Sequence, residues 1–286
     1  HTPWIPRPVS ILSAYGNGRL ALSFELFPPK TPESEATMWR TVDELAERDP
    51  VLVTCTYGAG GSTRGKTLEI LAGLRRRHPF AVRGERQGTL RRAQRFVALR
   101  GDPPQGETAF RAVEGGLSYA SELVALIRAE FPRFGILVAG YPETHQEAAS
   151  PRADLENLKR KVDAGGDVVV TQLFYDNADF FRYRDACRRL GVQAPIVPGV
   201  MPVTNFKQIR RIATLCGAKL PDDFTRAFEK AGDDEAAQFE AGVAFAAKQV
   251  EELVAAGVPG IHFYVLNKSP ATLRVLDAVG IGGRKA

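Results

Sequence analysis

Cysteine is scarce in this chain: three are present among 286 residues, at positions 55, 187 and 216. Their wide spacing fits neither a disulfide framework nor a cysteine-based metal site, and unpaired thiols are typical of a reducing cytoplasm. The four histidines show no ligand spacing either, so no metal site is expected. We interpret Cys55, Cys187 and Cys216 as small packing residues rather than as nucleophiles.

Long apolar runs are also absent, since none approaches the ~18 residues that a membrane span needs. Two prolines interrupt the stretch 5–12, so no secretory signal is expected there. The net charge is +5, yet the basic residues are scattered, and the densest cluster, 75–77, ends a predicted helix where cations complement the dipole. Neither a membrane nor a nucleic acid is an expected partner. Mild positive charge suits a polyanionic small substrate instead.

The chain does contain a regular alternation of apolar strands and amphipathic helices. Strands are predicted near residues 22, 51, 96, 135, 168, 195 and 260. Helices are predicted over 33–48, 67–77, 117–131, 153–164, 177–190, 205–216, 236–256 and 270–279, with a short or irregular helical insertion over 221–235. This alternation predicts parallel strands with crossover helices. We expect a single α/β domain over residues 1–286, a (β/α)8 TIM barrel.

One unit of that barrel is incomplete. Seven strands are recognisable where eight would close the ring, and the missing strand belongs between residues 77 and 96. The segment 78–94 is too short and too polar for a strand, a loop and a full helix. The third βα unit is therefore predicted to be shortened, or to be incomplete in this sequence.

Glu25 is the first candidate for a catalytic residue. It lies in the strand 22–27, whose even-numbered residues are apolar and share one face, and a double proline ends this strand. An acid at the carboxyl end of a barrel strand points to an active site, while an exposed glutamate on an edge strand is the alternative. The same order of apolar strand, acid and double proline recurs at Asp102.

Polar residues follow the other predicted strands as well. Carboxylates and amides with few cations at a common barrel mouth suit proton transfer better than phosphoryl transfer. No Ser-His-Asp or Cys-His order is present, which disfavours acyl transfer. The glycine-rich loop 58–63 lacks the Lys-Ser/Thr ending of a P-loop. The residues at the strand ends are Glu25, Thr56, Tyr57, Asp102, Tyr141, His145, Gln172, Asn267 and Lys268.

An ordered set of motifs resembles the methylenetetrahydrofolate reductase family, in its bacterial form made of the catalytic barrel alone. The matching segments are 23–30 (Ser-Phe-Glu-Leu-Phe-Pro-Pro-Lys), 56–58, 98–104, 141–145, 154–165, 171–174, 198–206 and 262–268. They occur in family order across nearly the whole chain. One segment alone would be weak, but the ordered set is specific.

The resemblance implies a function in one-carbon metabolism. FAD would lie at the barrel mouth, NADH or NADPH would reduce it, and 5,10-methylenetetrahydrofolate would then be reduced to 5-methyltetrahydrofolate by a ping-pong sequence. Glu25 matches the acid that protonates the departing folate nitrogen, and its apolar flanks Phe24, Leu26 and Phe27 suit an acid that holds its proton. Asp102 matches a fixed charge beside flavin and pterin, and Gln172 matches a residue that hydrogen-bonds the pterin.

The resemblance also implies two binding sets. Flavin contacts are implied for Thr56, Tyr57, Arg100, Gly101, Asp102, Tyr141, His145, Asp154, Asn157 and Lys161, and folate contacts for Glu25, Gln172, Gln208 and Lys268. One departure is Ile212, which stands where a bacterial family member has an aromatic residue. The incomplete third unit leaves open a folate-binding barrel without flavin, either a binding protein or a methyl-transfer relative. The sequence does not choose between NADH and NADPH, and it leaves a homo-oligomer open.

Overall fold

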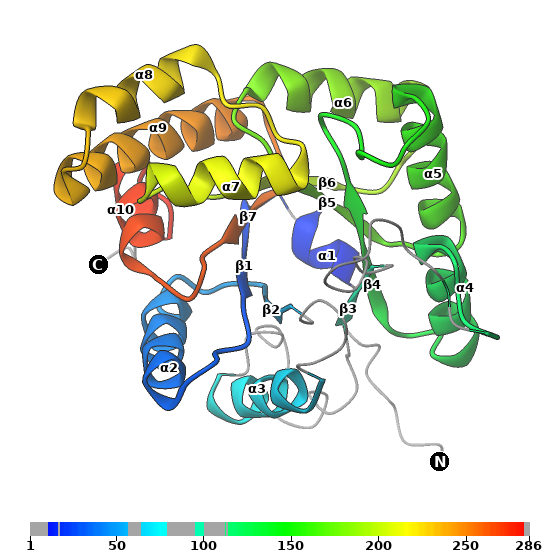
Figure 1. The fold of residues 1–286 in the computed structure, drawn as a ribbon. Coiled ribbons are helices and arrows are strands. Elements are labelled where there is room, and N and C mark those ends of the chain that lie inside the picture. Colours follow the sequence, from blue (N-terminus) through cyan, green and yellow to red (C-terminus); the bar gives the residue numbers. More distant parts are fainter. Residues whose placement is uncertain are drawn as a thin grey trace.

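A ring of parallel strands surrounded by helices makes up the described part of the chain. The computed structural model describes residues 11–16, 18–56, 64–78, 95–99, 112 and 114–282, arranged as Figure 1 shows. All seven predicted strands are present. They are β1 (Ala21–Leu26), β2 (Leu52–Cys55), β3 (Arg95–Ala98), β4 (Gly135–Gly140), β5 (Val168–Leu173), β6 (Ile196–Val200) and β7 (Gly260–Tyr264).

The order of hydrogen-bonded strands is β2-β1-β7-β6-β5-β4-β3, and every neighbouring pair is parallel. The first and last strands pair directly, with Ala21 opposite Gly260 and Glu25 opposite Tyr264. This pairing closes the ring on one side, as a barrel requires, and confirms the predicted fold class. Among the described residues β2 and β3 do not pair. Most of the incomplete third unit, residues 79–94, lies outside the described ranges.

Helices connect successive strands and cover the outside of the ring (Figure 1). The predicted helices are confirmed with shifts of a few residues at their ends, and the insertion forms a regular helix, α8. None of the described helices has both the length and the apolar composition for crossing a bilayer. They are α1 (Ile11–Tyr15), α2 (Pro32–Ala46), α3 (Arg64–Arg77), α4 (Ala120–Glu130), α5 (Pro151–Asp163), α6 (Asn177–Arg189), α7 (Phe206–Cys216), α8 (Asp222–Ala231), α9 (Glu235–Ala255) and α10 (Pro270–Ala278).

Side chains that alternate along the strands form two apolar layers. Phe24, Leu26 and Phe263 are fully buried against the surrounding helices, where each such side chain contributes roughly 1.5–3 kcal/mol. The inner layer consists of residues from the early part of the strands, and α1 packs against it through Ile11 and Tyr15. The short helix α1 thus fills the amino-terminal end of the barrel. Polar side chains are left to the opposite, carboxyl-terminal end.

Candidate active site at the carboxyl ends of the strands

Glu25 points into the barrel near the end of β1. The alternation predicted for this strand is confirmed, because Phe24 and Leu26 are fully buried on the helix side, whereas Ser23 and Glu25 contact His262 of β7. The side chain of Glu25 keeps an exposed fraction of 15%. It is therefore accessible from the mouth while the strand around it is fixed.

The immediate neighbours of Glu25 differ from the expected apolar setting. Its Oε2 lies 3.8 Å from Nε2 of His262. Burial raises the pKa of the Tyr264 hydroxyl well above its usual value, and the charge of Glu25 adds to this effect. Burial and, to a smaller extent, Glu25 also raise the pKa of the Cys55 thiol to about 12. Phe24 and Leu26 do not supply the expected apolar setting, because a strand turns adjacent residues to opposite faces.

Gln172 lies at the kinked end of β5. The pairing of β5 with β6 shifts register between Val170 and Leu173, and the Gln172 Oε1 accepts a hydrogen bond from the Leu173 N–H at 2.9 Å. Tyr264 donates its hydroxyl to the carbonyl of Thr171 at 2.7 Å. Because Tyr264 also pairs with Glu25 across the sheet, it links the Gln172 end of β5 to the acid.

Gln208 and Lys268 line one groove at the carboxyl ends of β6 and β7. The groove has a volume of about 230 Å³, and both Tyr264 and Leu266 are among its walls. Gln208 comes from the first turn of α7, which Asn205 caps by accepting the Gln208 N–H at 2.8 Å. The structure thus brings both residues implied for folate together, next to the tyrosine that faces Glu25.

Four of the residues implied for flavin form a second cluster, around the end of β4. The buried Asp154 accepts the backbone N–H of His145 at 3.1 Å. The rings of His145 and Tyr141 pack edge to face at 4.6 Å, and the Lys161 ammonium lies 5.5 Å from the Tyr141 ring centroid. Lys161 Nζ also donates to the Ala139 carbonyl at 2.6 Å.

Burial dominates the electrostatics of this cluster. It lowers the pKa of the Lys161 ammonium to about 8, although the Asp154 carboxylate favours the charged form. It raises the pKa of Asp154, against the hydrogen bond from His145 and the charge of Lys161. The charge of the half-buried Lys161 ammonium is only partly compensated by the Asp154 carboxylate, so Lys161 can accept an additional anionic partner.

Of the remaining implied residues, the structure describes Thr56 and Asn157. Thr56 follows β2, and its carbonyl accepts the Thr67 hydroxyl at 3.0 Å. Asn157 is exposed on α5 and accepts a hydrogen bond from Arg160 at 2.7 Å, so no described contact joins it to Lys161. Tyr57, Arg100, Gly101 and Asp102 lie outside the described residues.

Three residues of the site were missed by reasoning from sequence: Ser23, His262 and Tyr264. Ser23 Oγ lies 2.9 Å from His262 Nδ1, and both residues are almost fully buried. A signal existed, because His262 and Tyr264 alternate on the last strand as Ser23 and Glu25 do on the first. Whether these two pairs of residues lie opposite each other depends on the register in which β1 pairs with β7, and this register cannot be read from the sequence.

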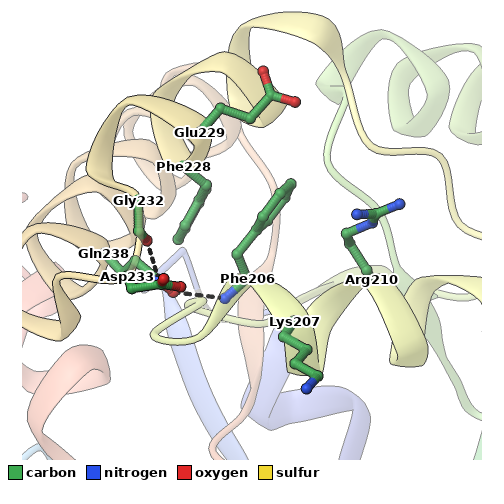
Figure 2. Close-up of a pocket in the computed structure, with 8 residues that line it drawn as sticks. All are labelled: Phe206, Lys207, Arg210, Phe228, Glu229, Gly232, Asp233 and Gln238. Carbon is green, nitrogen blue, oxygen red and sulfur yellow. Dashed lines mark hydrogen bonds between the residues drawn. The ribbon is translucent and has the colours of Figure 1, made fainter.

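A larger hollow of about 410 Å³ lies between α7 and α8, and Figure 2 shows its walls. Phe206 and Phe228 stack there at 5.3 Å. The buried Gln238 accepts the Phe206 N–H at 2.9 Å and donates to the Gly232 carbonyl at 2.6 Å, as the dashed lines mark. None of the residues implied for catalysis or binding lines this hollow, so we place the site at the Glu25 end of the barrel.

Known proteins resemble this chain over most of its length. The family model described as methylenetetrahydrofolate reductase matches residues 10–82 and 90–280. The 5,10-methylenetetrahydrofolate reductase of Escherichia coli (strain K12) is 36% identical over 279 residues, 92% of each chain. Its counterpart from Pectobacterium carotovorum is 37% identical over 281 residues, 92% of this chain and 91% of that one.

Plant and clostridial proteins extend the comparison. Methylenetetrahydrofolate reductase (NADH) 1 of Zea mays is 38% identical over 296 residues, and this chain spans 50% of the maize protein's length. A Clostridium thermocellum structure, described as an uncharacterised protein that binds two copies of 5-methyl-5,6,7,8-tetrahydrofolic acid, has a TM-score of 0.57 at 14% identity. It covers 94% of this chain and 98% of its own, and it supports the barrel fold. The family match and the bacterial relatives together show that the chain belongs to the methylenetetrahydrofolate reductase family.

Proposed function

We propose that this protein reduces 5,10-methylenetetrahydrofolate to 5-methyltetrahydrofolate, with FAD as its cofactor and NADH or NADPH as the electron donor. The observation that carries the proposal is the convergence on Tyr264 of Glu25, the Gln172 end of β5 and the groove lined by Gln208 and Lys268. The names of the bacterial and maize relatives support the same reaction. The maize name favours NADH as the donor.

The cluster around Lys161 fits a flavin dinucleotide. Its ammonium is half-buried and held by the Ala139 carbonyl, so it supplies positive charge for a diphosphate at a fixed place. Tyr141 and His145 supply aromatic surface next to that charge. When bound, FAD would pass a hydride from the nicotinamide to the folate. The family resemblance adds Thr56, Tyr57, Arg100, Gly101, Asp102 and Asn157 to this set as a prediction.

Glu25 would act as the proton donor. The folate nitrogen that departs when the five-membered ring opens needs a proton, and Glu25 is an acid that reaches the mouth from a fixed strand. Gln172 would hydrogen-bond the pterin through its amide nitrogen, because its oxygen is already bonded to Leu173. Asp102 would stabilise the cationic intermediate, a role that stays a prediction.

The groove would hold the rest of the substrate. Lys268 is exposed at its edge and would attract the carboxylates of the folate tail, and Gln208 would bond a polar atom of that tail. Ile212 would replace an aromatic stacking residue with an aliphatic contact. Cys55, Cys187 and Cys216 form no disulfide bond, which suits the cytoplasm, where we place the reaction.

The test separates the two half-reactions in rapid mixing experiments. Glu25→Gln should leave flavin reduction by NADH within about twofold of the unchanged protein, and it should slow flavin reoxidation by methylenetetrahydrofolate by roughly 10²–10⁴-fold. Glu47→Gln, an exposed glutamate that follows α2, is the matched control. Equal loss in both half-reactions would refute the assignment of Glu25 as the acid.

The alternative is a folate-binding barrel without flavin, a binding protein or a methyl-transfer relative. The clostridial structure keeps this reading open, because it is described by the folate that it binds. Titration with FAD decides between the two. A flavin absorption band that saturates, followed by NADH-dependent bleaching, supports the reductase. Folate binding without any flavin band would support the alternative and refute the proposed reaction.

A further inference from the structure

His262 is a buried titratable residue for which the proposed reaction has no role. It lies in the middle of β7 with an exposed fraction of 2%. Its two ring nitrogens face two different side chains of β1: Nδ1 lies 2.9 Å from Ser23 Oγ, and Nε2 lies 3.8 Å from Glu25 Oε2. The imidazole therefore stands between a hydroxyl fixed in the barrel interior and the acid at its mouth.

The chemistry of the three groups selects one arrangement of protons. A neutral imidazole carries a hydrogen on one nitrogen and a lone pair on the other. If Ser23 donates its hydroxyl hydrogen to Nδ1, the ring hydrogen is on Nε2 and points toward Glu25. The opposite tautomer would turn a lone pair toward Glu25, and that lone pair would compete with the substrate for the acid's proton.

We propose that His262 is a positioning residue for Glu25, held by Ser23 with its hydrogen on Nε2. This inference rests on the proposed function. When the Glu25 carboxyl gives its proton to the departing folate nitrogen, a carboxylate is left behind. The Nε2–H then donates to that carboxylate, so the 3.8 Å separation shortens to a hydrogen bond. The ring itself stays neutral, and no proton passes through it.

The other titratable groups near the imidazole leave Glu25 as its one anionic neighbour among the described residues that face it. Tyr264, on the same strand, packs edge to face with His262 at 5.1 Å, and burial keeps its hydroxyl protonated. Burial and the nearby charge of Glu25 raise the pKa of the Cys55 thiol of β2 to about 12, so this thiol is uncharged at neutral pH. Tyr141, after β4, contributes to raising the pKa of the Tyr264 hydroxyl.

A first experiment tests the tautomer without any catalysis. The ring nitrogens of the four histidines are recorded by long-range ¹H–¹⁵N correlation on the flavin-bound protein at neutral pH, and the His262 signals are assigned by their loss in His262→Gln. We expect a neutral ring with its hydrogen on Nε2. A hydrogen on Nδ1, or a doubly protonated ring, would overturn the proposal whatever the enzyme's reaction is.

A second experiment uses the two half-reactions of the flavin-bound protein. His262→Asn keeps a polar group for Ser23 but removes the donor toward Glu25, so flavin reoxidation by methylenetetrahydrofolate should slow by roughly 10- to 100-fold, a share of what a positioned acid contributes. Flavin reduction by NADH should change by less than about twofold. His262→Gln places an amide nitrogen near the Nε2 position and should recover most of the loss.

Ser23→Ala removes the hydroxyl that fixes the tautomer of His262. It should slow flavin reoxidation by methylenetetrahydrofolate by less than His262→Asn does, and it should leave flavin reduction by NADH unchanged. The matched control is Phe263→Leu, on the outward face of the same strand, where the side chain packs on Phe24. It should leave the ratio of the two half-reactions unchanged.

Equal slowing of both half-reactions in His262→Asn, or no rescue by glutamine, would overturn the proposal. If His262→Asn does not fold, Ser23→Ala and the nitrogen spectra decide it. If the unchanged protein binds FAD but does not reduce the folate, the proposed function fails. In that case the ¹⁵N spectra still determine the tautomer of His262, because they do not depend on the reaction.

Discussion

Lys161 should destabilise the protein when no anionic ligand is bound. Burial lowers the pKa of its ammonium from 10.5 to about 8, which corresponds to about 3 kcal/mol at ~1.36 kcal/mol per pKa unit. The attraction of Asp154 is already included in this figure, and the hydrogen bond from the ammonium to the Ala139 carbonyl offsets about 1–2 kcal/mol of it. Lys161→Met keeps most of the packing and should therefore raise the free energy of unfolding of the flavin-free protein by about 1–2 kcal/mol at pH 7.

The pH dependence follows from the sign of the shift. Between pH 8 and 10.5 the unfolded chain keeps a proton on Lys161 that the folded chain has released, so the stability of the unchanged protein rises with pH. The advantage of Lys161→Met should shrink over this range. Urea unfolding curves recorded by circular dichroism at pH 7, 8.5 and 10 measure this difference in the free energy of unfolding between the two proteins. Lys159→Met on the same helix is the matched control, because Lys159 pairs with Asp163 at the surface and should matter by less than about 0.5 kcal/mol.

In saturating FAD the unchanged protein should become more stable than Lys161→Met, which reverses the order expected without flavin. A ligand that binds only the folded state adds stability that grows with the logarithm of the ratio of its free concentration to its Kd, and the unchanged protein should gain more because it should bind FAD more tightly. A Lys161→Met protein that is less stable than the unchanged one at pH 7 without flavin would refute the reasoning. So would a stability difference that does not vary with pH.

Three further substitutions test the packing around the site. Asn267→Ala removes two hydrogen bonds to the backbone of Phe27, at 2.9 and 2.7 Å, and should lower the free energy of unfolding by about 1–2 kcal/mol in urea titrations and raise KM for the folate. Gly242→Ala would place a Cβ 1.6 Å from the Val203 carbonyl oxygen, and should lower the melting temperature by more than any of the other substitutions. Thr54→Val removes a buried hydroxyl without a partner among the described residues, so thermal unfolding should show no loss of stability.

The barrel is predictable from sequence because strands buried on both faces read as continuous apolar runs. Residues 168–170, three valines, are such a run, and all three are buried. The helix α1 is not predictable in this way, since Ile11–Tyr15 is too short to show a helical period. Its position inside the barrel depends on contacts with residues far along the chain, such as Val168 and Val197.

The inward direction of Glu25 is also predictable, because alternation along β1 leaves one orientation once Phe24 and Leu26 are buried. The partners of Glu25 are not predictable, since they come from the other end of the chain. His262 and Tyr264 meet it only through the register in which β7 pairs with β1. A sequence pattern states which face a residue occupies, but not which residue faces it across a parallel sheet.

The seam between β1 and β7 explains why the acid stands where it does. Five register pairs join these strands, and beyond them the Asn267 side chain continues the ladder by bonding both the N–H and the carbonyl of Phe27. Thr41 of α2 donates to the Asn267 carbonyl at 3.0 Å, which ties the same corner to a helix. A proton donor must keep its place within a fraction of an ångström, and β1 is paired on both sides. Glu25 therefore lies near the end of a strand that is held from both sides, and under the proposed function substitutions along this seam should impair proton donation before they unfold the protein.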